Sequence, residues 1–157
     1  MDDIAIRLAG PPDQAAVEAC TRSAYAAFAR RVGYDPEPVT ADYGALIAAG
    51  QVRALERAGR TAGVLVVRDE TDHLLIYSVA VAPDHQGGGL GRALMAEAET
   101  IARRLGRDRV VLYTNEKMAE NIRFYERLGY RSFARRANER RPGNWIVYMD
   151  KSVAPGR

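Results

Sequence analysis

The sequence is poor in cysteine, histidine and lysine, and it has no long uncharged run. Because Cys20 is the one cysteine among 157 residues, an intrachain disulfide is excluded. His73 and His85 are the two histidines, so a metal site would have to borrow carboxylates, and none is expected. No stretch of 18 residues lacks a charge, which argues against a membrane span. A basic and apolar leader is also missing, so we expect a cytoplasmic protein without a membrane partner.

Positive and negative charges nearly balance in this chain. The 23 basic residues outnumber the 20 acidic ones by only 3, an excess too small to predict nucleic-acid binding. Five arginines nevertheless lie close together near the C-terminus. They are Arg131, Arg135, Arg136, Arg140 and Arg141. This cluster is interpreted either as a solvated hairpin face or as an attraction for an anionic ligand or substrate. A third interpretation, recognition of nucleic acid by the hairpin, predicts salt-sensitive binding of DNA or RNA.

The length and the apolar pattern predict one domain, residues 1–157, built on a mixed sheet. The expected order is a strand, two helices, three strands, a helix, a strand, a helix and two strands. The predicted strands are 4–8, 51–57, 62–68, 74–81, 110–113, 130–135 and 145–150. The predicted helices are a stretch capped by Asp13 and ending near Val32, and then 40–49, 90–105 and 118–128. The strand at 74–81 is the most apolar, so we expect it at the centre of the sheet.

A glycine-rich turn joins this apolar strand to the most amphipathic helix. Four of the five residues from Gly87 to Gly91 are glycine. Glycine lets a ligand approach the backbone because no Cβ intervenes, and the first turn of a helix has unpaired N–H groups and a positive dipole end. The turn therefore predicts a phosphate site. It does not fit a Walker loop, which needs a lysine. It does not fit the dinucleotide fingerprint Gly-x-Gly-x-x-Gly either, because the sixth residue is Arg92 when counted from Gly87 and Leu94 when counted from Gly89.

The spacing that fits is Gln86-x-x-Gly89-x-Gly91, which resembles the pyrophosphate loop of the GNAT superfamily of N-acetyltransferases. The strand end at 80–83 resembles the family's strand before that loop. Downstream, Tyr113-Thr-Asn and the segment 121–130 (Asn-Ile-Arg-Phe-Tyr-Glu-Arg-Leu-Gly-Tyr) resemble its fifth strand and the helix that follows. The resemblance covers residues 51–150 well. In the first fifty residues, only the order of helices and strands matches the family. It implies an α/β fold: a mixed, mostly antiparallel sheet of about seven strands flanked by about four helices.

The same resemblance implies a reaction and a set of site residues. Acetyl-CoA would be the cosubstrate, without a metal, and its acetyl group would pass directly to a primary amine of a small molecule or peptide. The amides of 86–92 would hold the pyrophosphate. The backbone of 79–81 would hold the pantetheine arm and the thioester carbonyl. A hydrogen-bond donor at that carbonyl would stabilise the oxyanion that develops when the amine attacks. The implied cosubstrate-binding residues are Val79, Ala80, Val81, Gln86, Gly87, Gly88, Gly89, Leu90, Gly91, Arg92, Asn121 and Tyr125.

Tyr125 is the implied catalytic residue, as the acid that protonates the departing thiolate. It follows Asn121 by one helical turn, so both side chains can face one cleft. With reference pKa values of about 10 for tyrosine and about 8.5 for a thiol, this proton transfer is slightly uphill but feasible within a hydrogen bond. The alternative interpretation of Tyr125 is an aromatic residue that only packs on its helix.

The general base and the acceptor stay open. The middle of the strand at 74–81 is Tyr77-Ser78, without an acid, and His73 at its start is either a base or a structural residue. Three tyrosines in the acceptor region are core or pocket residues: Tyr25, Tyr34 and Tyr43. The missing acid supports an alternative function, a catalytically inactive acyl-CoA-binding module of the same fold. Proteins of this family are commonly homodimers, and the run Trp145-Ile-Val-Tyr148 is apolar on both strand faces, so a homodimer is expected.

Overall fold

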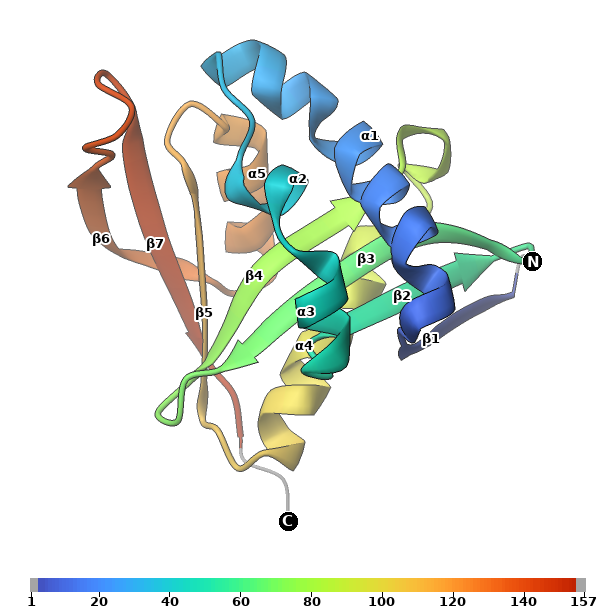
Figure 1. Ribbon diagram of the computed structural model, residues 1–157. Coiled ribbons are helices and arrows are strands. Elements are labelled where there is room, and N and C mark those ends of the chain that lie inside the picture. The colour runs from blue at the N-terminus through green and yellow to red at the C-terminus, as the bar shows by residue number, and fades with distance from the viewer. Residues whose placement is uncertain (1–2, 155–157) are drawn as a thin grey trace.

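The computed structural model describes residues 3–154, and it contains a seven-stranded sheet in the order β1-β2-β3-β4-β5-β7-β6 (Figure 1). The strands are β1 (Ile4–Leu8), β2 (Val52–Arg57), β3 (Arg60–Asp69), β4 (Leu74–Val81), β5 (Arg109–Asn115), β6 (Arg131–Ala137) and β7 (Trp145–Ser152). The helices are α1 (Gln14–Val32), α2 (Glu37–Thr40), α3 (Tyr43–Ala48), α4 (Leu90–Arg104) and α5 (Ala119–Arg127), with 3-10 turns η1 (Pro11–Asp13) and η2 (Pro83–His85). The expected mixed, mostly antiparallel sheet with helices on its faces is confirmed.

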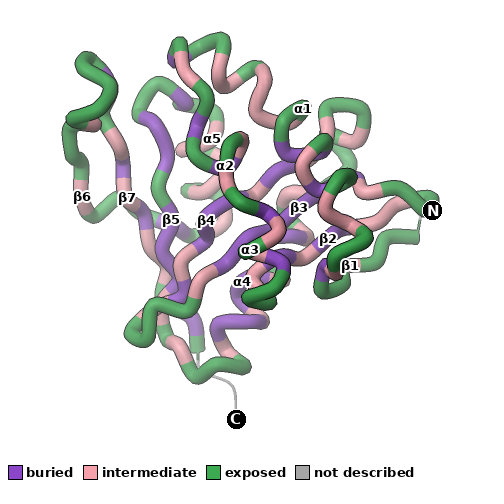
Figure 2. Tube along the Cα trace, in the orientation of Figure 1, coloured by how far each residue is buried: buried purple, intermediate pink, exposed green. Residues whose placement is uncertain are grey.

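Apolar side chains fill both faces of the sheet, as Figure 2 shows for the buried central strands. On one face, α4 places Leu94 and Met95 against β3 and β5, and α5 packs partly buried side chains on the same core. On the other face, α1 and α3 pack Val17 and Ile47 against β2 and β3. Alternation along a strand explains the division, because successive side chains point to opposite faces. Strand β4, buried on both sides, lies at the centre of the sheet as predicted.

One predicted helix start and one predicted side-chain cap are wrong. The predicted helix at 40–49 is in fact two elements: Thr40 ends the single turn of α2, and α3 begins at Tyr43. The cap of α3 is Asp42, whose carboxylate accepts a hydrogen bond of 3.1 Å from the amide of Ala45. At α1, Asp13 occupies the N-cap position, but its side chain does not cap the helix.

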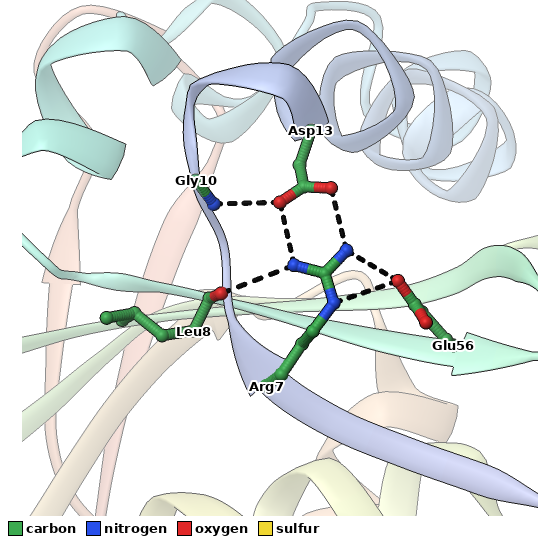
Figure 3. Close-up of polar contacts among 5 residues, drawn as sticks. All are labelled: Arg7, Leu8, Gly10, Asp13 and Glu56. Atoms are coloured by element: carbon green, nitrogen blue, oxygen red, sulfur yellow. Dashed lines mark hydrogen bonds and ion pairs between the residues drawn. The ribbon is translucent and has the colours of Figure 1, made fainter.

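The Asp13 carboxylate instead joins the start of α1 to the edge of the sheet (Figure 3). The Arg7 guanidinium donates to both of its oxygens, at 2.8 and 2.7 Å, and also pairs with Glu56 on β2. The amide of Gly10 donates to the same carboxylate at 2.7 Å. A bidentate arginine pair is stronger and more directional than a neutral hydrogen bond, so it outcompetes the capping geometry. The hydrogen bond from Arg7 and that from Gly10 lower the pKa of Asp13 to about 2.

Strands β4 and β5 form the one parallel pair in the described sheet, and they separate before either one ends. Their pairing runs only from Leu74 with Val110 to Ile76 with Leu112. Beyond Ile76, β4 continues to Val81 beside β3, and β5 continues to Asn115 beside β7 (Figure 1). The β3–β4 register shifts beside Tyr77, where the divergence begins. The divergence leaves the β5 side of the second half of β4 free for other partners.

Candidate active site

A cavity of about 600 Å³ occupies the opening between β4 and β5. Its walls come from α1, the segment between α1 and α2, the diverging halves of β4 and β5, α5, and the β6–β7 hairpin. Segments far apart in the sequence therefore meet here, and the volume lies within the range of small-molecule sites.

Three of the predicted site residues line this cavity together: Val79, Asn121 and Tyr125. Asn121 and Tyr125 lie on the same side of α5, as their spacing predicts. The Tyr125 ring packs against Phe124 and Tyr130, with ring centroids 5.4 and 6.3 Å away. Burial raises the pKa of Tyr125, and the neighbouring Tyr25 adds to the rise. The phenol is therefore protonated at neutral pH, the state that a proton donor requires.

Tyr25 reaches from α1 to the point where β4 leaves β5. Its hydroxyl lies 3.1 Å from the Ser78 hydroxyl and donates to the Val79 carbonyl at 3.5 Å. Burial raises the pKa of Tyr25 to about 12, so it too stays protonated. Of the three tyrosines left open by the sequence, Tyr25 and Tyr34 line the cavity. Tyr43 belongs to the core, where its hydroxyl donates to the Pro38 carbonyl.

The glycine-rich turn lies beyond the far end of β4 and leads into α4. Gly87 and Gly89 have φ angles of +83° and +79°, which residues with a Cβ rarely adopt. Nothing lies within 4 Å of a Cβ placed on either one, so their positions face open space. In the described part of the chain, no group accepts a hydrogen bond from the amides of 87–89. The first amides of α4 add to these donors, and the dipole of α4 is positive here.

Side chains around this turn fix its position, and one of them adds a positive charge beside it. Gln86 donates from its amide nitrogen to the Val81 carbonyl at 3.1 Å, which fixes the turn to the end of β4. Leu90 anchors the start of α4 in the core, and Arg92 is exposed on the first turn. Ala80 is buried on the α1 side of β4, so only its backbone is available to a ligand. Unpaired amides and the positive end of a helix dipole are the features that bind phosphate groups in proteins.

Two close approaches around this turn were not predicted from the sequence. A Cβ on Gly88 would lie 3.1 Å from a guanidinium nitrogen of Arg57, so a positive side chain from β2 lies beside the turn. A Cβ on Gly91 would lie 3.4 Å from the Phe124 ring, which brings α4 and α5 together. The Val81 side chain is the other neighbour of Gly91, so the turn and the cavity-lining helix α5 meet at the end of β4.

Four other titratable side chains near the motifs do not line the cavity: His73, His85, Glu116 and Glu120. His73 lies at the opposite end of β4, with its Nδ1 beside the Asp72 carboxylate. Glu116 pairs with Arg135, and Glu120 pairs with Arg31. These positions favour the structural interpretation of His73.

The cavity also contains residues that sequence reasoning missed. Glu37 on α2, Tyr77 on β4 and Tyr113 on β5 are among its lining residues. Burial raises the pKa of both phenols, and the Glu37 carboxylate adds to the rise. Alternation from Val79 could not have found Tyr77, because the β3–β4 register shifts at Tyr77: its side chain packs in the α1-side core, whereas Val79 packs against the α4-side core. No local pattern marked Glu37, since it reaches the cavity through the path of the chain between α1 and α3.

Asn115, at the end of β5, links two walls of the cavity. Its amide nitrogen donates to the Tyr34 hydroxyl at 3.0 Å and to the Asn144 side-chain oxygen at 2.9 Å. Its own oxygen accepts from the amide of Lys117 at 2.9 Å. The side chain is 1% exposed, so each of these bonds is protected from water. The segment after α1 and the β6–β7 hairpin are thereby held to the same strand end.

The apolar run in β7 is accounted for within one chain. Val147 and Met149 point into the α4-side core, and Ile146 and Tyr148 line the cavity on the other face. Trp145 lies under the Arg135 guanidinium, 3.9 Å from the ring centroid. The run therefore does not require a second chain to cover one of its faces.

Comparison with known proteins agrees with this geometry. The model of the acetyltransferase (GNAT) family matches residues 16–130, more than half of the chain. The chain is 40% identical to mycothiol acetyltransferase from Salinispora arenicola over 67 residues, which are 42% of this chain and 22% of that protein. It is 40% identical to glucosamine 6-phosphate N-acetyltransferase from Trypanosoma brucei brucei over 60 residues, which are 38% of this chain and 39% of that protein. The chain thus spans well under half the length of these relatives.

Two solved structures have the same fold over nearly the whole chain. PaiA N-acetyltransferase from Thermoplasma acidophilum, in complex with coenzyme A, aligns with a TM-score of 0.80 and 16% identity, covering 96% of this chain and 99% of that one. Ribosomal-protein-alanine N-acetyltransferase from Brucella melitensis aligns with a TM-score of 0.75 and 20% identity, covering 95% and 99%. The diverging strands, the glycine-rich turn and the family match agree with one another, and the chain belongs to the acetyltransferase (GNAT) family.

Proposed function

We propose that this protein transfers an acetyl group from acetyl-CoA directly to a primary amine. The observation that carries the proposal is the continuity of two features along β4: unpaired amides in the turn after it, and a cavity where it separates from β5. The first suits the pyrophosphate of CoA, and the second suits a thioester and an amine. Membership of the acetyltransferase family supports the same reaction.

The chain offers a group for each part of this reaction. The amides of 87–92 bind the pyrophosphate, with Gln86 holding the turn and Arg57 beside it as a further cation. The backbone of Val79 to Val81 and the Asn121 side chain hold the pantetheine arm. The amine nitrogen attacks the thioester carbon, a C–N bond forms and the C–S bond breaks. The attacking nitrogen releases one proton to solvent, and the phenol of Tyr125 gives its proton to the departing sulfur and regains one from solvent.

The raised pKa of Tyr125 bears on this role. A higher pKa makes the phenol a weaker acid, which opposes proton transfer to a thiolate. The same burial raises the pKa of a thiol held beside it, because low dielectric disfavours each charged form. The two shifts act in the same direction, so the second offsets part of the first.

Release of free thiol from acetyl-CoA, measured over a panel of amines, tests the proposed reaction. We expect amine-dependent release, with the acetylated amine as the second product. If acetyl-CoA binds and no amine increases thiol release, the chain is the inactive acyl-CoA-binding module that the missing acid on β4 suggested. In the described residues, no group of three or more His, Cys, Asp or Glu side chains is placed to hold a metal, so the assay is set up with and without a chelator.

We also propose that residues 1–157 act as one domain and associate as a homodimer. The two apolar cores share one sheet, which supports a single domain. Exposed Ile4 and Leu8 on the edge strand β1 support a second copy. None of the described helices is long and apolar enough to cross a bilayer, and a cytoplasmic location stays a prediction.

A further inference from the structure

The arginines of the β6–β7 hairpin fall into two groups that the sequence could not separate. Arg135 is neutralised by Glu116, and its guanidinium stacks on Trp145 outside the cavity. Arg136 and Arg140 line the cavity instead, and neither has an ion-pair partner among the described residues. The Arg136 guanidinium lies over the ring of Tyr148, another lining residue, 5.4 Å from its centroid.

The opposite wall of the cavity carries a carboxylate among aromatic rings. The lining of the cavity here includes Glu37, Tyr77 and Tyr113. A carboxylate and the faces of tyrosine rings both attract an ammonium group. The hairpin wall has one acid of its own, Glu139, against its two arginines, so that wall keeps an excess of positive charge. Among the lining side chains, the α2 side thus carries an acid and the hairpin side an excess of arginine, while Arg68, outside the lining, lies over the Tyr77 ring, 4.3 Å from its centroid.

We propose that the acceptor is a zwitterion: a small primary amine that also carries a carboxylate or a phosphate group. This rests on the proposed function and names the substrate class of the same site. The ammonium group binds beside Glu37 and the tyrosines before it loses its proton, and the anionic group binds Arg136 and Arg140. Arginine presents paired N–H donors that match either anion. The divergence of β4 and β5 holds the two charged walls on either side of the reaction centre.

The test compares matched acceptors and matched variants. Each acid is paired with a neutral form of the same amine: amino acids with their amides, and an amino-sugar phosphate with the unphosphorylated amino sugar. The two pairs separate carboxylate from phosphate as the anion. The variants are Arg136→Gln and Arg140→Gln, with Arg131→Gln as control, because Arg131 is exposed on the same strand but does not line the cavity. Calorimetry with acetyl-CoA accompanies every variant.

We expect the parent to use at least one acid with a kcat/KM about tenfold or more above that of its neutral partner. Arg136→Gln and Arg140→Gln should each remove most of that preference by raising KM for the acid, while Arg131→Gln retains it. Glu37→Gln should raise KM for acid and neutral amine alike, since it acts on the shared ammonium group. Affinity for acetyl-CoA should be unchanged throughout.

Two results overturn the proposal alone: equal use of neutral and acidic amines, or acetylation of neutral amines with no use of any acid. A preference that survives both arginine substitutions overturns the assignment of these side chains. If the parent does not bind acetyl-CoA, or binds it and acetylates no amine, the proposed acetyl transfer itself fails, so the two failures are distinguishable.

Discussion

At the scale of single residues, Tyr125 combines a place in the cavity with a protonated phenol. Tyr125→Phe keeps the ring and its packing and removes only the proton. If this proton reaches the departing sulfur, kcat should fall roughly 100-fold while the affinity for acetyl-CoA is retained. Steady-state kinetics with a single-turnover measurement checks this, because slow product release can mask slowed chemistry.

A neighbouring tyrosine provides the control for this prediction. Tyr130 packs on Tyr125, but its hydroxyl donates to the buried Glu99 carboxylate at 3.3 Å, away from the cavity. Tyr130→Phe should therefore lower the thermal midpoint and leave kcat nearly unchanged. If Tyr125→Phe turns over within about threefold of the parent at saturating substrate, the acid role is wrong. A rise in KM for acetyl-CoA alone would mean that Tyr125 only positions pantetheine.

The ion pair between Arg7 and Asp13 predicts a pH dependence of stability. The pKa of Asp13 is lowered to about 2 in the folded protein from an ordinary value of 3.8. The unfolded state therefore binds this proton first as the pH falls. The contribution to folding is present in full above about pH 4 and is lost as the pH falls through about 2.

Asp13→Asn tests this linkage. The variant should have a lower thermal midpoint than the parent at pH 7, and the difference should shrink between pH 4 and pH 2. Glu126→Gln is the control, because Glu126 is exposed on α5 and has no ion pair in the described structure. A difference between Asp13→Asn and the parent that stays constant down to pH 2 would show that the charge of Asp13 contributes nothing.

At the scale of elements, α4 offers a matched pair of glycines at its two ends. Gly89 and Gly106 have φ angles of +79° and +73°, and a Cβ on either would meet nothing within 4 Å. Gly89→Ala and Gly106→Ala should thus cost similar backbone strain, about 1 kcal/mol of stability. Only Gly89→Ala places a methyl group against the pyrophosphate. Calorimetry should show at least a tenfold loss of acetyl-CoA affinity, about 1.4 kcal/mol, for that variant alone.

If both glycine variants bind acetyl-CoA as tightly as the parent, the assignment of the turn to the pyrophosphate is wrong. A loss of affinity in both would instead report a general distortion of α4. The comparison is informative because the two substitutions match in chemistry, helix and backbone conformation and differ in what each end of the helix faces.

The end of β5 carries the next prediction. Asn115 holds Tyr34 on one wall of the cavity and Asn144 on the hairpin that forms another. Asn115→Ala releases both walls, so KM for the amine should rise roughly three- to tenfold, the value of one or two hydrogen bonds. KM for acetyl-CoA should not change, because its proposed contacts lie on β4, the turn and α5. If KM for the amine and KM for acetyl-CoA rise equally, Asn115 does not act on the amine side of the cavity alone.

Much of this arrangement could be predicted from local sequence. The spacing of apolar residues identified α4, whereas the anion site that the motif from Gln86 to Gly91 predicts stays a prediction. Thr40 was misplaced because the stronger cap, Asp42, follows it two residues later. Asp13 was misread because its partner Arg7 lies on a different element. The charged walls were beyond prediction, since they depend on where β4 and β5 separate, and that is a property of the whole sheet.

At the scale of the whole molecule, the two edges of the sheet differ in charge. Strand β6 presents Arg131, Arg135 and Arg136 along one edge, and Phe133 on it is 48% exposed beneath Arg109. A symmetric pairing of two β6 edges would bring these like charges together. Strand β1 has a single arginine, Arg7, which Asp13 and Glu56 neutralise. A second copy would therefore meet β1 and not β6.

The side chains of β1 support that choice and provide its test. Ile6 packs against the α4-side core, and by alternation Ile4 and Leu8 share its face, yet they are 43% and 55% exposed. We expect light scattering to report twice the chain mass of 17.3 kDa. Leu8→Lys should dissociate the dimer, because a charge on an edge strand opposes association. Phe133→Lys, the matched change on β6, should leave it intact. A parent of 17.3 kDa at assay concentrations contradicts the homodimer, and dissociation by Phe133→Lys alone would move the interface to β6.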